Sequence, residues 1–178
     1  MKRAIGTAIA GLSLIVGLGT AHAETVTVPV HELTSQGTGK RIGVIELRDT
    51  DFGLLILPDL AGLSPGKHGF HVHQNPTCRP GAKGGETVPG RAAGGHYDPG
   101  NAGRHEGPIG QGHLGDLPVL VVNDKGRATL PVMAPRLQVP DIVERALIVH
   151  AHGDNYADRP KPLGGGGARV ACGVIPLP

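Results

Sequence analysis

Short apolar runs, separated by turn-forming residues, recur along the chain. They are rich in Val, Ile, Leu and Thr, and several alternate with polar residues, which is the pattern of β-strands. Eight such runs span residues 25–33, 41–48, 54–57, 69–73, 119–122, 128–132, 146–150 and 170–175. The pattern predicts an all-β protein.

Glycine and proline, with 30 and 16 residues, interrupt the chain too often for helices of three turns. Pro29 lies inside the first run and predicts that this strand is an edge strand or contains a bulge. The sequence Asn-Asp-Lys-Gly at 123–126 predicts a hairpin turn. Both features agree with a fold of short strands.

Two segments lack a sustained apolar period. Residues 75–118 form a long stretch rich in Gly and Pro, and residues 153–167 end in four consecutive glycines. A long loop inside a folded domain usually has a function. We find no internal repeat, so we expect one domain with its chemistry in these two loops.

The first 23 residues have the pattern of a secretory signal peptide. Lys2 and Arg3 precede an apolar run that ends near residue 18, and Ala21-His22-Ala23 is a small-x-small cleavage pattern. The apolar run is shorter than the roughly 20 residues that cross a bilayer. We expect a mature domain of residues 24–178, without a membrane anchor. It would lie in the periplasm of a host with two membranes and be secreted from a host with one.

Removing this peptide changes the formal charge from +2 to zero, because it contains Lys2 and Arg3 and no acidic residue. The sequence has no cluster of basic residues typical of a nucleic-acid-binding face. The mature chain, about 155 residues long, is large enough to bury a substantial core. Composition therefore favours an exported globular domain that does not bind nucleic acid.

Cys78 and Cys172 both lie in the part of the chain that we expect to be exported. An oxidising compartment favours a disulfide between them. The bridge would close a loop of about 95 residues and stabilise the fold by about 4 to 5 kcal/mol in the chain-entropy model. The competing interpretation is that the two thiols bind a metal, although neither belongs to a Cys-x-x-Cys pair.

Seven side chains of types that bind metals follow one another at irregular spacings. They are His71, His73, His96, His105, His113, Asp116 and His150. In a strand, His71 and His73 point to the same face because side chains alternate, which gives half of a copper site. Imidazoles with one carboxylate in the long loop suit a closed tetrahedral zinc site. The sequence therefore predicts a protein with two metals.

Five motifs together resemble the exported bacterial branch of the copper/zinc superoxide dismutases. They are Gly-Phe-His-Val-His (69–73), Gly-Gly-His-Tyr-Asp-Pro (94–99), Gly-His-Leu-Gly-Asp-Leu (112–117), Val-His-Ala-His-Gly-Asp-Asn-Tyr (149–156) and Gly-Gly-Gly-Gly-Ala-Arg-Val-Ala-Cys-Gly-Val-Ile (164–175). The resemblance runs through most of the mature chain. It implies an eight-stranded Greek-key β-sandwich, or flattened barrel, with long metal-binding and electrostatic loops.

The resemblance also implies a role for each candidate side chain. The implied copper ligands are His71, His73, His96 and His150, and the implied zinc ligands are His96, His105, His113 and Asp116. His96 would bridge the two metals. Asp154 resembles a carboxylate that links a copper-ligand histidine to a zinc-ligand histidine. Cys78 and Cys172 resemble the family disulfide.

The implied reaction is the dismutation of superoxide to oxygen and hydrogen peroxide. Copper would change oxidation state, zinc would remain redox-silent, and His96 would release the copper and take up a proton. Arg169 resembles an arginine beside the copper that guides the anionic substrate. We therefore assign catalytic roles to Arg169 and His96.

Three further histidines have simpler interpretations. We expect His31 to be solvated, and we expect a structural hydrogen bond from His68, which points away from His71 in a regular strand. His152 stands where the resemblance implies a small residue, and a contact with the copper rim is the less favoured interpretation. Trp is absent from the chain, and both a monomer and a homodimer are compatible with the sequence.

The main alternative function is a non-catalytic protein that carries or stores copper and zinc in the cell envelope. Carriers of Cu(I) often use Met or Cys ligands, whereas this chain has two Met, one of them the initiator. A second alternative is a dismutase-like protein without zinc. His105, His113 and Asp116 argue against it.

Overall fold

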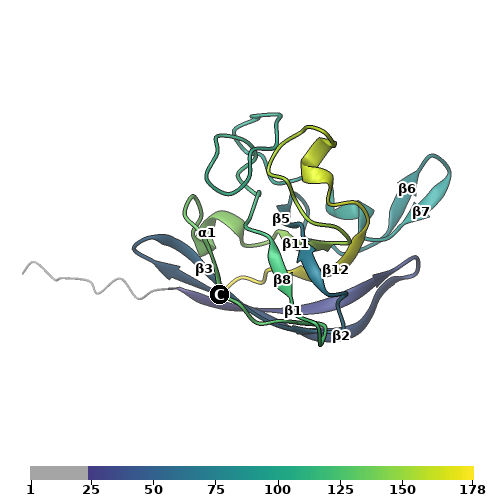
Figure 1. The fold of residues 1–178 in the computed structure, drawn as a ribbon, viewed down its shortest axis with the longest axis horizontal. Helices are drawn as coiled ribbons and strands as arrows, with labels where there is room; N and C mark the ends of the chain where they lie inside the picture. Colours follow the sequence, from purple (N-terminus) through teal and green to yellow (C-terminus); the bar gives the residue numbers. More distant parts are fainter. Residues whose placement is uncertain (1–23) are drawn as a thin grey trace, which may run out of the picture.

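The computed structural model describes residues 24–178, and its strands pair antiparallel throughout. Three long strands form the lower layer in Figure 1, and most of the shorter strands and loops lie above them. The long strands are β1 (Thr25–Thr34), β2 (Gly37–Thr50) and β3 (Gly53–Ala61). The expected signal peptide and its cleavage site lie outside the described residues.

The remaining strands are short. They are β4 (Gly66–His68), β5 (Phe70–His73), β6 (Gly81–Lys83), β7 (Glu86–Val88), β8 (Leu120–Val122), β9 (Arg127–Ala128), β10 (Val132–Ala134), β11 (Ala146–His150) and β12 (Arg169–Val174). The helical segments are single turns: α1 (Val139–Ile142), η1 (Arg91–Ala93) and η2 (Pro162–Gly165). The expected absence of long helices is confirmed for the described residues.

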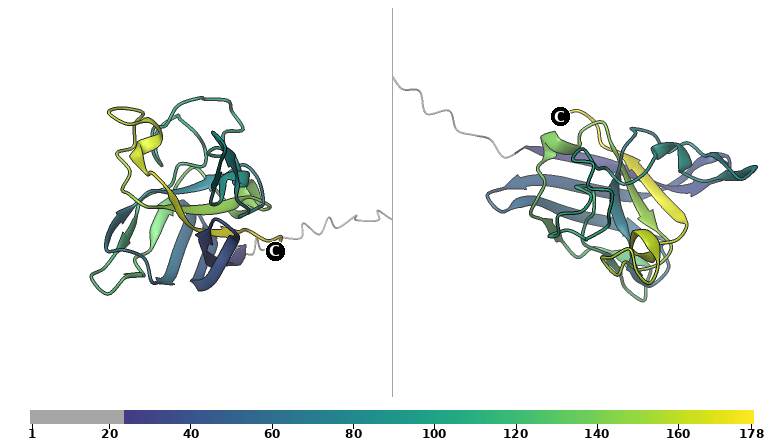
Figure 2. Two further views of the ribbon diagram at one scale, coloured as in Figure 1. Left: turned by 90° about the vertical axis from the view of Figure 1, so that its right-hand side faces the viewer. Right: turned by 90° about the horizontal axis from the view of Figure 1, so that it is seen from above.

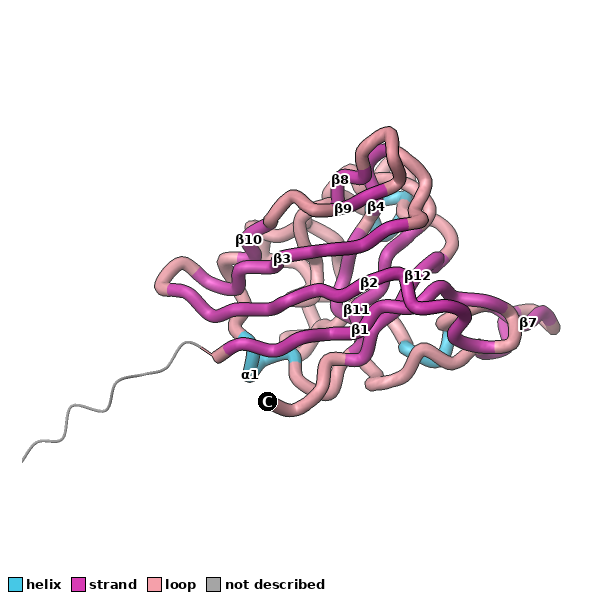
Figure 3. The backbone as a smooth tube through the Cα atoms, turned by 90° about the horizontal axis from the view of Figure 1, so that it is seen from below, coloured by secondary structure: helices cyan, strands magenta, loops and turns pink. Residues whose placement is uncertain are grey.

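Eight strands form one continuous sheet in the order β10-β3-β2-β1-β12-β11-β5, with β9 also paired to β3. The sheet curves into a half-barrel, and from below β10, β3, β2 and β1 lie side by side (Figure 3). The chain crosses from β3 to β5 at the other end of the sheet and later returns to β10 beside β3. These crossings are of the Greek-key type, so the expected eight-stranded all-β fold is confirmed.

Alternation along the strands builds the core. In β1, Val26, Val28 and Val30 are buried while the residues between them are exposed. The same period on the neighbouring strands brings Ile45, Leu47 and other apolar side chains into one cluster, which also includes Phe70 and Val72 of β5. Because β5 belongs to this core, the histidines between and after its apolar residues have a rigid support.

The boundaries of several strands differ from those predicted. Residues 128–132 do not form one strand, because β9 and β10 pair with β3 in the same register but are separated at Pro131, which has no N–H to donate. The run 69–73 corresponds to β5, which begins one residue later at Phe70, and β4 is a separate short strand before it. β2 and β3 are longer than the apolar runs at 41–48 and 54–57, since backbone pairing continues through polar residues.

Pro29 is not on an edge strand, because β1 lies between β2 and β12 in the sheet. The register between β1 and β2 shifts just beyond it, between Val30 and His31, so the bulge is confirmed and the edge position is wrong. The turn at 123–126 is also confirmed, since Gly126 N donates to Asn123 O over 2.9 Å.

The long segment 75–118 is not structureless throughout. It contains the hairpin β6–β7, which projects from the body of the molecule, and the turn η1 (Figure 1). Its later part and the segment 153–167 cover the same end of the sheet, as the left view of Figure 2 shows. Among the described residues, no helix is long and apolar enough to cross a membrane.

Cys78 and Cys172 form a disulfide with a Cα–Cα distance of 5.8 Å. The bridge fastens the beginning of the long loop to β12 in the sheet. Because both sulfur atoms are in this bond, the interpretation of the two thiols as metal ligands is wrong.

Candidate metal centre

Backbone pairing between β5 and β11 brings the first three candidate histidines together. His71 and His73 alternate with apolar residues on β5, and Ile148 of β11 pairs with His71. The register of β11 with β12 shifts between Val149 and His150, which places His150 opposite Arg169. The predicted common face of His71 and His73 therefore gains a third imidazole from β11.

Two loop segments join the other edge of β5 through Val72. Val72 N donates to Gly115 O over 2.9 Å, and Tyr97 N donates to Val72 O over 2.8 Å. These bonds align His96 with His73 and Asp116 with His71 as bridge partners. Main-chain hydrogen bonds therefore carry the loop residues to the strand histidines.

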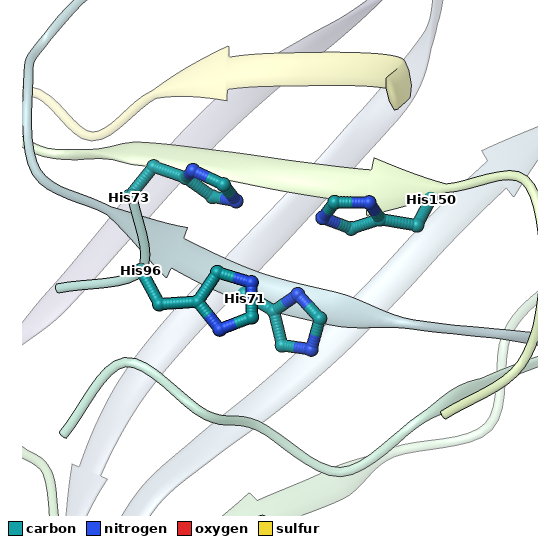
Figure 4. A group of neighbouring side chains, drawn as sticks. All are labelled: His71, His73, His96 and His150. Atoms are coloured by element: carbon teal, nitrogen blue, oxygen red, sulfur yellow. The ribbon is translucent and has the colours of Figure 1, made fainter. Parts of the chain in front are cut away.

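The side chains form two overlapping clusters of possible ligand atoms. One contains His71, His73, His96 and His150, and their rings gather in one place in Figure 4. The second contains His71, His96, His105 and Asp116, and within each cluster the ligand atoms lie within 4.8 Å of one another. His96 belongs to both clusters.

His113 lies at the margin of the second cluster. Its Nδ1 is 3.4 Å from Asp116 Oδ1, whereas His96 Nδ1 and His105 Nδ1 are each 2.9 Å from an oxygen of Asp116. The ring of His113 lies 5.3 Å from the His96 ring between centroids. The sequence-predicted residues are thus all brought together, with His113 the least tightly held.

In the first cluster, each histidine that comes from a strand has one ring nitrogen in a hydrogen bond and one without a hydrogen-bond partner in the described part of the chain. His73 Nδ1 bonds to Gly94 O over 3.0 Å, and His150 Nδ1 bonds to Gly167 O over 3.2 Å. His71 Nε2 lies 2.6 Å from Asp154 Oδ2. Since a carbonyl or carboxylate oxygen only accepts, each ring donates through that nitrogen, and its other nitrogen carries a lone pair.

Those remaining nitrogens are buried without a hydrogen-bond partner among the described residues. They are His71 Nδ1, His73 Nε2 and His150 Nε2, and His113 Nδ1 shares this state, whereas His105 Nδ1 faces Asp116 Oδ2 at 2.9 Å. An unpaired buried nitrogen lone pair is costly unless a metal binds it. The donor set fits copper and zinc, because imidazole suits both metals and a carboxylate completes a zinc site.

Asp154 connects the two clusters. Its Oδ2 accepts from His71 Nε2 over 2.6 Å and its Oδ1 accepts from His105 Nε2 over 2.8 Å. The carboxylate therefore fixes the tautomer of one histidine from each cluster. This is the contact that the resemblance implied for Asp154.

Burial and charge set the protonation of these groups in the metal-free protein. Burial lowers the pKa of His71 to about 3 and that of His150 to about 4. Burial also lowers the pKa of His73 and His96. At neutral pH these rings are therefore uncharged, as metal ligands must be.

In contrast to these lowered values, the pKa of His105 is raised by two neighbouring carboxylates. Burial opposes its charged form, but the hydrogen bonds that its ring donates to Asp116 and Asp154, with the negative charge of both groups, outweigh burial and raise its pKa to about 9. Burial opposes ionisation of these two carboxyl groups as well, but their histidine partners hold both pKa values well below the usual range. In the metal-free protein a proton on His105 therefore occupies the region where a cation would bind.

A cavity of about 330 Å³ opens beside the first cluster. His73, His96, His150 and Arg169 line it, and Lys83 and Arg91 add positive charge. A larger groove, of about 1150 Å³, lies beside the disulfide and touches none of the clustered ligands. The smaller cavity is therefore positively charged and adjoins the first cluster.

Two backbone carbonyls hold Arg169 beside this cavity. Its Nη1 donates to Gly90 O over 2.6 Å and its Nη2 donates to Gly94 O. Burial and the charge of Arg91 lower its pKa to about 10, so the guanidinium is charged at neutral pH. Arg169 does not pair with Asp154, whose partners are histidines.

The other histidines lie outside the clusters. His68 is buried, and its ring bonds to His150 O over 2.6 Å and to Ser64 O over 2.8 Å, so the predicted structural role is confirmed. His31 is half-buried. His152 is exposed, with its ring near Gly167, and it does not line the smaller cavity.

Asp158 is a residue of this region that the sequence did not predict. Its Oδ2 accepts from His105 N over 2.9 Å, and its Oδ1 accepts from Leu163 N over 3.0 Å. Leu163 lines the smaller cavity. A second Asp four residues after Asp154 was the only signal, and short polar residues are common in loops of any kind.

Comparisons with known proteins agree with this geometry. The model of the family "Copper/zinc superoxide dismutase (SODC)" matches residues 41–175. The superoxide dismutase [Cu-Zn] of Escherichia coli (strain K12) is 53% identical over 168 residues, which are 94% of this chain and 96% of that protein.

Two solved structures have the same fold. The Cu/Zn superoxide dismutase from Brucella abortus has a TM-score of 0.84 and 52% identity, covering 85% of this chain and 99% of its own. The monomeric copper, zinc superoxide dismutase from Salmonella enterica has a TM-score of 0.77 and 54% identity with the same coverage.

Proposed function

Because the chain belongs to the copper/zinc superoxide dismutase family, we propose that its two clusters are the copper and zinc sites of that enzyme. As a member of the family it converts superoxide to oxygen and hydrogen peroxide with copper and zinc as cofactors. We assign copper to His71, His73, His96 and His150, and zinc to His96, His105, His113 and Asp116. The converging unpaired ring nitrogens are the observation that carries this assignment.

The two metals would supply different chemistry: copper alternates between Cu(II) and Cu(I), whereas zinc keeps one oxidation state. The protein's own groups supply orientation and protons. Asp154 holds His71 and His105 in one tautomer, and the carbonyls of Gly94 and Gly167 do the same for His73 and His150. These fixed rings keep the metal-binding geometry through each turnover.

His96 is the residue to which we assign proton transfer. Its Nδ1 contacts Asp116 over 2.9 Å, so its Nε2 is the nitrogen left for the copper-side cluster. Two superoxide anions need two protons to become oxygen and hydrogen peroxide. We assign one proton to His96 Nε2, and the second comes from solvent in the cavity.

Arg169 is the group to which we assign substrate binding. Its charged guanidinium lines the cavity with the copper-side histidines, and carbonyl hydrogen bonds fix its orientation. The positive groups at the cavity raise the local concentration of a small anion. Superoxide would thus approach along a path that Arg169, Lys83 and Arg91 make positive.

Metal content and dismutation, measured on one preparation of mature protein, test the function. We expect one copper and one zinc per chain and rapid dismutation that depends on copper. Stoichiometric metals without dismutation would instead support a carrier or storage protein.

An Asp116→Ala variant tests the zinc assignment. Asp116 contacts His96, His105 and His113 but lies outside the copper-type cluster. We expect loss of zinc with copper retained, measured as metal content after dialysis. Retention of zinc by this variant would contradict the ligand set.

We also propose export of the mature domain and activity of a single chain. The disulfide between Cys78 and Cys172 supports an oxidising compartment such as the periplasm. An amino terminus other than Glu24 in fractionated protein would contradict cleavage after Ala23.

The proposal that a single chain is active is supported by the site itself. All proposed ligands, Asp154 and Arg169 come from one chain, and the Salmonella enterica relative is described as monomeric. Activity per chain that falls on dilution would contradict a functional monomer.

A further inference from the structure

His113 differs from the other proposed histidine ligands in how its ring is held. The rings of His71, His73, His105 and His150 each bond to a carboxylate or carbonyl oxygen, and His96 bonds to Asp116. Within residues 24–178, the ring of His113 makes no hydrogen bond. A ligand histidine without such a partner depends on its backbone for its orientation.

The backbone of His113 is held by Arg136. Arg136 Nη2 donates to His113 O over 2.6 Å, and the same guanidinium donates to three more carbonyls. Those are Gly107 O at 3.2 Å, Pro108 O at 3.1 Å and Gly112 O at 3.2 Å. One side chain therefore contacts both ends of the turn that separates the ligands His105 and His113.

Arg136 is itself anchored to the sheet. It comes two residues after β10, which pairs with β3 at three consecutive positions. The turn that Arg136 holds has no regular secondary structure between residues 107 and 112 and is rich in glycine. Without this contact the turn would keep only local bonds, such as Gln111 N to Glu106 Oε2 over 2.9 Å.

We propose that Arg136 is a positioning residue for the zinc site, which sets zinc affinity by fixing the backbone of His113. This inference rests on the zinc ligands proposed above. The planar guanidinium has five N–H donors in a fixed arrangement and spans four carbonyls, which a lysine ammonium does not match. The positive charge of Arg136 disfavours a nearby cation. Arg136 therefore raises zinc affinity through the position that it gives to the His113 backbone, and not through its charge.

The test is the zinc dissociation constant of the mature, copper-free protein, measured by competition with a chelator. We expect Arg136→Ala to weaken zinc binding about 10- to 100-fold, the range typical for residues that orient metal ligands. We expect Arg136→Lys to restore only part of this affinity. Cobalt(II), bound in place of zinc, should show an altered absorption spectrum in Arg136→Ala.

Arg104→Ala is the matched control. Arg104 also carries a positive charge beside this loop, but its side chain bonds to the exposed Glu106 over 2.8 Å. Truncation of Arg104 removes a positive charge but leaves the hydrogen bonds from Arg136 to the carbonyls of the turn. We expect zinc affinity equal to, or slightly above, that of the unchanged protein.

A double-mutant cycle separates positioning from general stability. In a His113→Ala background, Arg136→Ala should cause no further loss of zinc affinity, because the group that it positions is absent. If Arg136→Ala lowers the unfolding temperature of the metal-free protein but leaves zinc affinity unchanged, the inference is wrong. If His113→Ala itself leaves zinc affinity unchanged, the proposed ligand set is wrong instead.

Discussion

At the scale of single residues, Arg169 is held in a fixed position and lines the cavity through which we propose that superoxide approaches. Carbonyls of Gly90 and Gly94 hold its guanidinium at the cavity beside His73 and His150. We expect Arg169→Ala to lower dismutation about tenfold or more and to flatten the decline of rate with ionic strength, since salt screens the lost attraction. Rates measured over a range of salt concentrations, with both metals quantified, check this prediction.

Arg169→Lys is the matched control for charge. Lysine keeps the positive charge but not the two carbonyl contacts, so its salt dependence should resemble that of arginine while its rate is lower. Identical rates for the alanine variant and the unchanged protein at every salt concentration would remove Arg169 from the mechanism.

At the scale of elements, the loop between β11 and β12 depends on a glycine. Gly164 has a φ of +71°, and a Cβ added there would lie 2.0 Å from Asp154 Oδ1. We expect Gly164→Ala to displace the carboxylate that joins His71 to His105 and to weaken binding of both metals about tenfold or more. Competition with chelators measures both affinities.

Gly84→Ala provides the matched control for backbone strain. Gly84, between β6 and β7, has a φ of +60°, and a Cβ there meets nothing within 4 Å. We expect a loss of about 1 kcal/mol in stability and unchanged metal affinities. Equal effects of the two substitutions on metal binding would show that strain alone, rather than Asp154, is responsible.

At the scale of the whole molecule, the metal-free protein should be most stable near pH 6.5. Burial lowers the folded-state pKa of His71 to about 3 and of His150 to about 4, so protonation of the unfolded chain removes stability as pH falls below about 6.5. Asp116 and Asp154 raise the pKa of His105 to about 9, so its contribution is complete below about 6.5 and is lost as pH rises toward 9.

Urea unfolding of the metal-free protein at pH 4.5, 6.5 and 8.5 measures this dependence. A His105→Gln variant should lose the decline above pH 6.5 and keep the decline below it. Stability of the unchanged protein that rises steadily from pH 6.5 to 8.5 would contradict the raised pKa of His105.

The features that the sequence predicted best are local. The common face of His71 and His73 follows from strand alternation, and the apolar runs at 25–33 and 146–150 agree closely with β1 and β11. The single strand predicted at 128–132 was wrong. The run is mainly apolar, but Pro131 interrupts the backbone pairing with β3. Pairing is decided by a partner strand, which the local pattern does not include.

By itself, the sequence determined the strand-rich fold, the metal-binding residue types and the two cysteines that pair, because these depend on residue identity and short-range periodicity. Only the tertiary structure decided that β11 carries His150 to β5, that Asp154 spans two histidines, and that Arg136 holds the turn before His113. These contacts join residues 23 to 83 positions apart, and no local preference encodes them. They form when the sheet closes around its core and brings the two loops to the same end.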